Sequence, residues 1–172
     1  MFNIITQIIG LFGFISIVYS FQNNDRRKIL YFQILGNILF CLHFYLIGSP
    51  TGSAMNFLGI VRGLLFNQRN DKKWADNVIF MYIFLFVFSL AGYLTWEGIF
   101  SFLPTLGAVI GTIGLWIKNP SRIRTLCLIA SPCWLIYNIH SNSIAGILTE
   151  TFVTVSIIVA IVRFDFLKSI NS

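Results

Sequence analysis

Charged residues are scarce in this chain of 172 residues. Only 10% of the residues are Asp, Glu, Lys or Arg, whereas 56% are hydrophobic and 16% are aromatic. A soluble domain carries about 25% charged residues. Together with a mean hydropathy of +0.80, this composition excludes an ordinary soluble domain and favours a membrane protein.

The residue patterns of several function classes are also missing. Cys41, Cys127 and Cys133 lie in apolar stretches and offer neither a disulfide framework nor paired-ligand spacing, so we expect them to be packing residues. There is no Walker loop, paired acidic motif or His/Cys ligand spacing. We therefore expect no enzyme activity, no metal and no cofactor. The net charge of +6 lies in short clusters between apolar runs, so it does not indicate a nucleic-acid partner.

Apolar runs separated by polar, glycine- or proline-bearing breaks predict seven membrane-spanning helices. Their expected ranges are 2–22, 28–47, 51–66, 78–95, 99–117, 123–140 and 144–162. Helices are expected because a lipid-exposed backbone must satisfy its own hydrogen bonds. The first run lacks a basic leader and a small-residue cleavage site, so we expect a retained span and not a signal peptide.

The cationic residues support this count. Eleven fall on the side that holds the C-terminus and the loops after spans one, three and five, and none falls on the other side. They are Arg26, Arg27, Lys28, Arg69, Lys72, Lys73, Lys118, Arg122, Arg124, Arg163 and Lys168. The basic side is expected to be cytoplasmic, with the N-terminus outside. The twelfth cation, Arg62, is expected to snorkel from span three to the cytoplasmic interface.

The chain matches itself without gaps at an offset of 94 residues, which pairs Gly13 with Gly107, Phe40 with Trp134, and Asn56 with Glu150. This match predicts a parallel 3+1+3 repeat: a first triple-helix bundle (1–67), a cytoplasmic loop and linker helix (68–98), and a second bundle (99–172). A chance alignment of apolar triplets is the alternative.

Four of the paired side chains are expected at one level in the membrane. Phe40 and Asn56 flank the turn at Gly48 by eight residues each, and Trp134 and Glu150 flank Asn142 in the same way. At 1.5 Å per residue, each lies about 12 Å from its turn, close to the midplane of a core about 30 Å thick.

An aromatic residue near the end of one helix, followed about sixteen residues later by Asn, resembles the SWEET/SemiSWEET and PQ-loop (MtN3-like) superfamily. That resemblance implies a substrate pocket with Phe40 and Trp134 as walls and Asn56 and Glu150 as polar contacts. The family's PQ dipeptide is absent, since the matching positions read Ser16-Ile17 and Ile110-Gly111.

Two further resemblances concern the second half. The run from Ser131 to Asn138, followed by Gly146 and Glu150, resembles the YgjV-type family of bacterial inner-membrane proteins. Trp134 and Asn138 form a Trp-x-x-x-Asn pattern similar to that of nicotinamide riboside transporters of the PnuC type.

Glu150 is the strongest candidate for function. A charged carboxylate at the bilayer centre costs about 2.5–3.5 kcal/mol on insertion scales, so we expect a role in substrate binding or proton coupling. Trp134 can stack on a ring or on the apolar face of a sugar. Asn37 and Ser131 lie one helical turn from the pocket aromatics, whereas Tyr137 and Asn138 lie nearer the outer surface and are candidates for an entrance. Core packing and interhelical hydrogen bonding are the alternative roles.

The sequence therefore predicts a bacterial inner-membrane carrier of a small polar solute, working by alternating access. Its expected partners are the lipid bilayer and that solute, with homo-oligomerisation permitted but not required. The alternatives are a vitamin-precursor facilitator of the nicotinamide riboside kind, or a non-transporting membrane partner or sensor protein.

Overall fold

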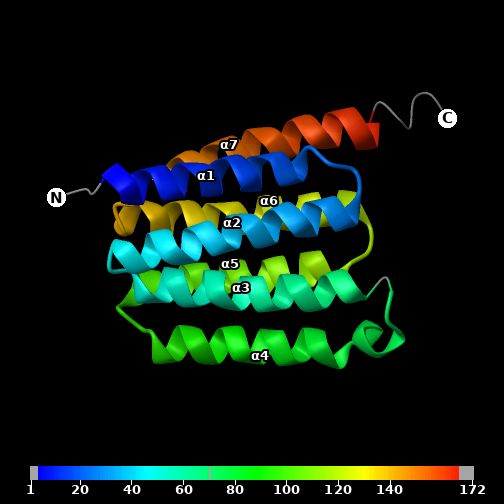
Figure 1. Cartoon of the computed structure of the whole chain (residues 1–172), viewed down its shortest axis with the longest axis horizontal. Coiled ribbons are helices and arrows are strands. Elements are labelled where there is room, and N and C mark those ends of the chain that lie inside the picture. Colours follow the sequence, from blue (N-terminus) through cyan, green and yellow to red (C-terminus); the bar gives the residue numbers. More distant parts are fainter. Residues whose placement is uncertain (1–3, 70, 167–172) are drawn as a thin grey trace.

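The computed structural model describes residues 4–69 and 71–166, and these fold entirely into helices and connecting turns (Figure 1). Lys168 and the first two residues of the expected first span lie outside this part. The described residues form seven α-helices: α1 (Ile4–Phe21), α2 (Arg26–Leu46), α3 (Pro50–Gln68), α4 (Ile79–Leu94), α5 (Phe102–Trp116), α6 (Pro120–His140) and α7 (Ile144–Ile161). Two short 3₁₀ helices, η1 (Lys73–Asp76) and η2 (Ile99–Ser101), and a five-residue π-helix, η3 (Val162–Phe166), complete the described part of the fold.

The all-helical prediction is confirmed, and the helix ends follow from local chemistry. The side chains of Asp25, Asn119 and Ser143 each accept a backbone N–H at the start of a helix. Pro50 and Pro120 occupy the first helical position, where a missing N–H costs nothing. The helix expected at 123–140 therefore begins earlier, at Pro120.

Six of the helices form a closed ring. α1, α2 and α3 make one layer, α7, α6 and α5 make the other, and contacts of α3 with α5 and of α1 with α7 join the two edges (Figure 1). α4 lies outside the ring and packs on α3 and α5. The bounds of α2 and α6 differ by 94 residues at both ends, and α3 and α7 begin 94 residues apart.

Four segments are long and apolar enough, by length and composition, to cross a membrane: Ile4–Phe21, Arg26–Leu46, Ile99–Trp116 and Ile144–Phe164. Ile79–Leu94 (α4) is a shorter apolar helix. α3 and α6 are long enough, but polar side chains such as Asn56, Arg62 and Asn138 reduce their apolarity. Large hydrophobic side chains on the outer faces, including Phe86 and Tyr93 of α4, are exposed as expected for contact with lipid.

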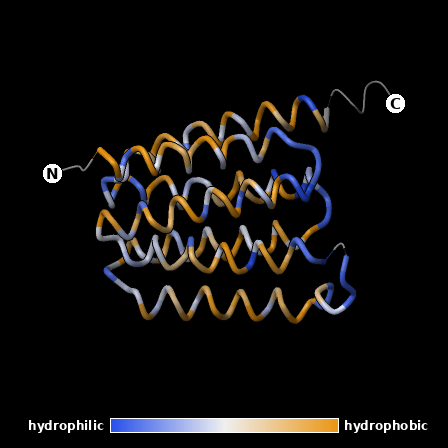
Figure 2. The backbone as a smooth tube through the Cα atoms, viewed as in Figure 1, coloured by the Kyte–Doolittle hydropathy of each residue, from blue (hydrophilic) through white to orange (hydrophobic). Residues whose placement is uncertain are grey.

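Hydrophilic residues gather in the loops at one end of the bundle, which we call the basic end (Figure 2). There Asp76 accepts hydrogen bonds from Lys118 Nζ at 2.7 Å and from Arg69 Nη2 at 2.7 Å. These bonds hold the pKa of Asp76 below its usual value. Arg69 also donates to the Trp116 carbonyl, so the network ties the segment after α3 to the end of α5. The opposite end carries the α2–α3 and α6–α7 turns, and we call it the turn end.

Candidate functional site

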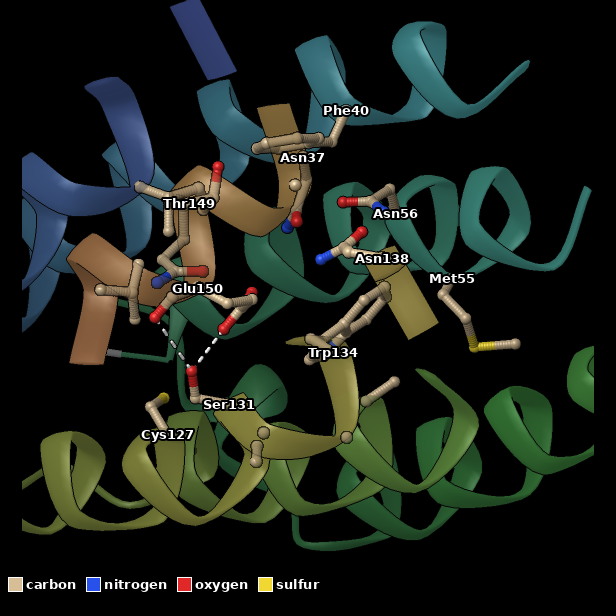
Figure 3. Close-up of a pocket in the computed structure, with 18 of the residues that line it drawn as sticks. Asn37, Phe40, Met55, Asn56, Cys127, Ser131, Trp134, Asn138, Thr149 and Glu150 are labelled. Carbon is tan, nitrogen blue, oxygen red and sulfur yellow. Dashed lines mark hydrogen bonds between the residues drawn. The ribbon is translucent and has the colours of Figure 1, made fainter. Parts of the chain in front are cut away.

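A cavity of about 120 Å³ lies between the two layers of helices (Figure 3). Every helix of the ring contributes lining residues, whereas α4 contributes none. Seven of the eight predicted site residues line it: Asn37, Phe40, Asn56, Ser131, Trp134, Asn138 and Glu150. A polar cavity of this size has room for several water molecules or one small solute.

Glu150 projects from α7 into this cavity. Its Oε2 accepts a hydrogen bond from Ser131 Oγ at 2.5 Å, which links α7 to α6 (Figure 3). Ser131 Oγ also lies 3.2 Å from Thr154 Oγ1, one turn further along α7. No cation pairs with Glu150 within the part of the chain that the structure describes. The carboxyl therefore keeps capacity for a further hydrogen-bond partner.

The rings of Trp134 and Phe40 each pack directly against a glycine of the preceding helix, an arrangement that we call a glycine seat. A Cβ added to Gly107 would lie 2.7 Å from Trp134 Nε1, and one added to Gly13 would lie 3.0 Å from the Phe40 ring. Only glycine allows these rings to approach the helix backbone so closely. The two pairs are separated by the same 94 residues, so the same local packing occurs twice.

Three amide side chains face the cavity beside Trp134, namely those of Asn37, Asn56 and Asn138 (Figure 3). Asn56 Nδ2 donates to the Gly52 carbonyl at 2.8 Å. Asn138 is only 2% exposed, and its Oδ1 has no hydrogen-bond partner among the described residues. An unsatisfied buried acceptor costs about 1–3 kcal/mol, so the described residues leave a costly polar atom without a partner beside the cavity.

The prediction that Arg62 snorkels to the cytoplasmic interface is wrong. Arg62 does not reach the interface: it is 7% exposed, lines the cavity, and donates through Nη1 to Ala108 O at 3.2 Å and Thr112 Oγ1 at 2.8 Å. Side chains lean toward the N-terminus of their helix, and α3 begins at the turn end. Arg62 therefore leans toward the middle of the bundle and away from the basic end. Sequence reasoning assigned it no function, although a cation inside a span is itself a signal for a site.

Tyr137 is the predicted site residue that does not line this cavity. It is 2% exposed, and its hydroxyl accepts the Gly52 N–H at 2.9 Å. It contributes instead to a second cavity of about 230 Å³ at the turn end, together with Ser49, Glu97 and His140. His140 stacks on Phe100 there, with ring centroids 4.2 Å apart.

Two packed hydrophobic clusters adjoin this cavity and contribute side chains to its wall. Phe40, Phe44, Tyr137 and Ala145 form a cluster on the side of the turn end. Phe21, Val153 and Ile157 form another toward the basic end. Within the described residues, no group of three His, Cys, Asp or Glu side chains is placed to hold a metal ion.

Apolar helices that surround a cavity with polar side chains in its wall define a helical membrane protein. Residues 4–168 match the Imp-YgjV family, described as bacterial inner membrane proteins, and the chain belongs to that family. The chain is similar to the inner membrane protein YgjV of Escherichia coli (strain K12), with 24% identity over 151 residues that cover 85% of this chain and 76% of that protein. No solved structure matches the chain. The protein is therefore a bacterial inner-membrane protein.

Proposed function

We propose that this protein is a transporter of a small polar solute, and that it works by alternating access. The observation that carries the proposal is the cavity, because six helices surround it. They place polar groups with unfilled hydrogen-bonding capacity next to two aromatic rings. Ligand sites typically combine apolar walls with a few convergent polar groups.

The proposed motion divides the ring into α1–α3 and α5–α7, related by a parallel repeat, with α4 as the linker. Three observations support this division: the equal bounds of α2 and α6 after an offset of 94 residues, the position of α4 outside the ring, and the paired glycine seats. The two joints, α3 with α5 and α1 with α7, are the places at which the halves would rock. The relation to the SWEET and PQ-loop plan belongs to this proposal.

The proposal also includes orientation. Seven crossings, with the N-terminus outside and the C-terminus in the cytoplasm, place the basic end at the cytoplasmic face in accord with the positive-inside rule. Glu150 is the proposed proton site if transport is coupled to a proton gradient. We propose no enzyme activity, because the sequence carries no Walker loop, paired acidic motif or His/Cys ligand spacing.

Uptake by reconstituted vesicles tests this function. The purified chain is inserted into liposomes and offered a panel of labelled sugars, nucleosides, amines and amino acids. We expect saturable uptake of at least one solute, and we expect Trp134→Ala to abolish it. Trp96→Ala is the matched control, because Trp96 is 51% exposed and lies outside the cavity. Panel-wide silence would instead favour a non-transporting partner or sensor protein.

A second candidate is a facilitator of vitamin precursors similar to nicotinamide riboside. Trp134 and Asn138 both line the cavity, so one copy of the Trp-x-x-x-Asn pattern faces a possible ligand. The corresponding positions of the first half are Phe40 and Phe44. Uptake of nicotinamide riboside in preference to the remainder of the panel would distinguish this candidate.

A further inference from the structure

The main cavity is lined by two side chains of opposite formal charge. Arg62 comes from α3 and Glu150 from α7, so each half of the ring contributes one. They form no salt bridge with each other or with any other described residue. Ionisable residues inside a membrane normally pair with one another, and an unpaired couple in one cavity is a functional signal.

The two groups lie at similar depths in the bundle. Glu150 is six residues into α7, which corresponds to about 9 Å from the turn end. The Arg62 guanidinium binds Ala108 and Thr112 of α5, which correspond to about 9 and 15 Å from the start of that helix. Since α5 and α7 both start at the turn end, one small molecule can face both groups (Figure 1).

We propose that the solute of this carrier is a small zwitterion, with a carboxylate held by Arg62 and an ammonium group held by Glu150. This inference rests on the proposed transport function and specifies its substrate class. It assigns a binding role to Arg62, which the sequence prediction had placed outside the site.

The surroundings of each charge fit its proposed partner. Nη1 of Arg62 is occupied by α5 and Nε is fully buried, whereas Nη2 makes no hydrogen bond to the described residues. The positive guanidinium suits a carboxylate, which Nη2 can bind through a charge-assisted hydrogen bond. Glu150 shares the cavity with Trp134 and Phe40, and aromatic faces next to a carboxylate suit an ammonium group.

A charge-matched set of probes tests the zwitterion directly on the wild-type protein. The zwitterions are glycine, 3-aminopropanoate, 4-aminobutanoate and 5-aminopentanoate, which separate the two charges progressively. Butanoate, 1-aminobutane and butanamide supply the anionic, cationic and neutral comparisons. Calorimetric titration in detergent should show one zwitterion binding at least about tenfold more tightly than every comparison compound, since losing a charge-assisted contact costs about that factor.

Two variants locate the binding groups. Arg62→Gln should reduce the preferred zwitterion to the affinity of 1-aminobutane, and Glu150→Gln should reduce it to that of butanoate. Arg26→Gln is the matched control, because Arg26 is also buried and bonded to backbone carbonyls of Phe66 and Leu115 but does not line the cavity. It should leave the preference unchanged.

The outcomes separate this inference from the proposed function. If vesicles take up a solute, but butanoate, 1-aminobutane or butanamide binds as well as every zwitterion, the proposed zwitterionic substrate class is wrong. The proposed transport function is then still supported by the uptake. If no solute of any charge class binds or enters vesicles, both proposals fail. The wild-type titrations decide the matter even if Arg62→Gln does not fold.

Discussion

His43 on α2 reaches Ser143 at the start of α7, with 2.9 Å between its Nε2 and Ser143 Oγ. The other ring nitrogen, Nδ1, lies 3.0 Å from the Thr6 carbonyl of α1. Ser143 Oγ also accepts the Gly146 N–H as the N-cap of α7. A fully buried imidazole therefore joins α1 and α2 to the start of α7 at the turn end.

The reciprocal contact comes from Tyr137, the residue 94 positions after His43. Its hydroxyl accepts the Gly52 N–H near the start of α3, at 2.9 Å. The middle helix of each layer thus binds the first turn of a helix in the other layer. These two bonds lie on the turn-end side of the main cavity, and in the proposed transport cycle they would have to break for that end to open.

Tyr137→Phe tests the strength of this closure. The substitution keeps the ring but leaves the buried Gly52 N–H without an acceptor, so we expect a loss of about 1–3 kcal/mol in unfolding free energy. Chemical unfolding in detergent measures the change. Tyr45→Phe is the control, because Tyr45 is 73% exposed. Equal stability of the two variants would show that the Tyr137 bond contributes nothing.

Gly107→Ala tests the glycine seat of Trp134. The new Cβ would lie 2.7 Å from Trp134 Nε1, so the indole must shift, at a cost of about 1–3 kcal/mol of strain. We expect weaker uptake and a lower melting temperature. Gly111→Ala, one turn further along α5, meets only Arg62 Nη1 at 3.9 Å and should be tolerated. A larger effect at Gly111 than at Gly107 would contradict this packing argument.

The helices were predictable because their signals are local. Apolar runs and the polar, glycine- or proline-bearing breaks between them placed the helix ends within three residues of those observed within the described part. Charge segregation supported a count of seven spans, and the described residues form seven α-helices. The offset of 94 residues indicated which side chains share a level, and Phe40, Asn56, Trp134 and Glu150 do line one cavity.

The site was less predictable where it depended on side-chain direction and partners. Arg62 was expected to snorkel to the cytoplasmic interface. The direction of its helix and its hydrogen bonds to α5 instead hold the side chain inside the bundle. Tyr137 was expected nearer the outer surface as a candidate for an entrance, and the sequence did not indicate that its hydroxyl accepts the N–H of Gly52 on another helix. Such long-range bonds leave no local pattern in the chain.

Asp76→Asn tests the ion-pair network at the basic end. The pKa of Asp76 is lowered from 3.8 by hydrogen bonds from Lys118 and Arg69. A carboxyl whose pKa is lower in the folded state stabilises the fold above its unfolded pKa, and this stabilisation is lost as the pH falls through the folded pKa. We therefore expect the variant to melt below the wild type at neutral pH, with the difference shrinking below about pH 3.8.

Melting curves recorded from neutral to acidic pH in detergent measure this difference. Asp71→Asn is the control, because the Asp71 and Arg27 side chains are 59% and 55% exposed, and exposed pairs contribute little. A difference between wild type and Asp76→Asn that grew as the pH fell would reverse the predicted sign and remove Asp76 from the network's stabilising groups.

Glu150→Gln separates the charge of this residue from its structural bond. The Gln carbonyl can still accept the Ser131 hydroxyl that now lies 2.5 Å from Glu150 Oε2, so we expect the fold to persist. A proton can no longer be gained or lost at this position, so uptake driven by a pH gradient across vesicles should disappear. Glu97→Gln, at the turn-end cavity, should retain that uptake. Full gradient-driven uptake by Glu150→Gln would exclude Glu150 as the coupling site. The coupling proton would then have to be carried by Arg62 or Cys127, the other ionisable side chains that line the cavity.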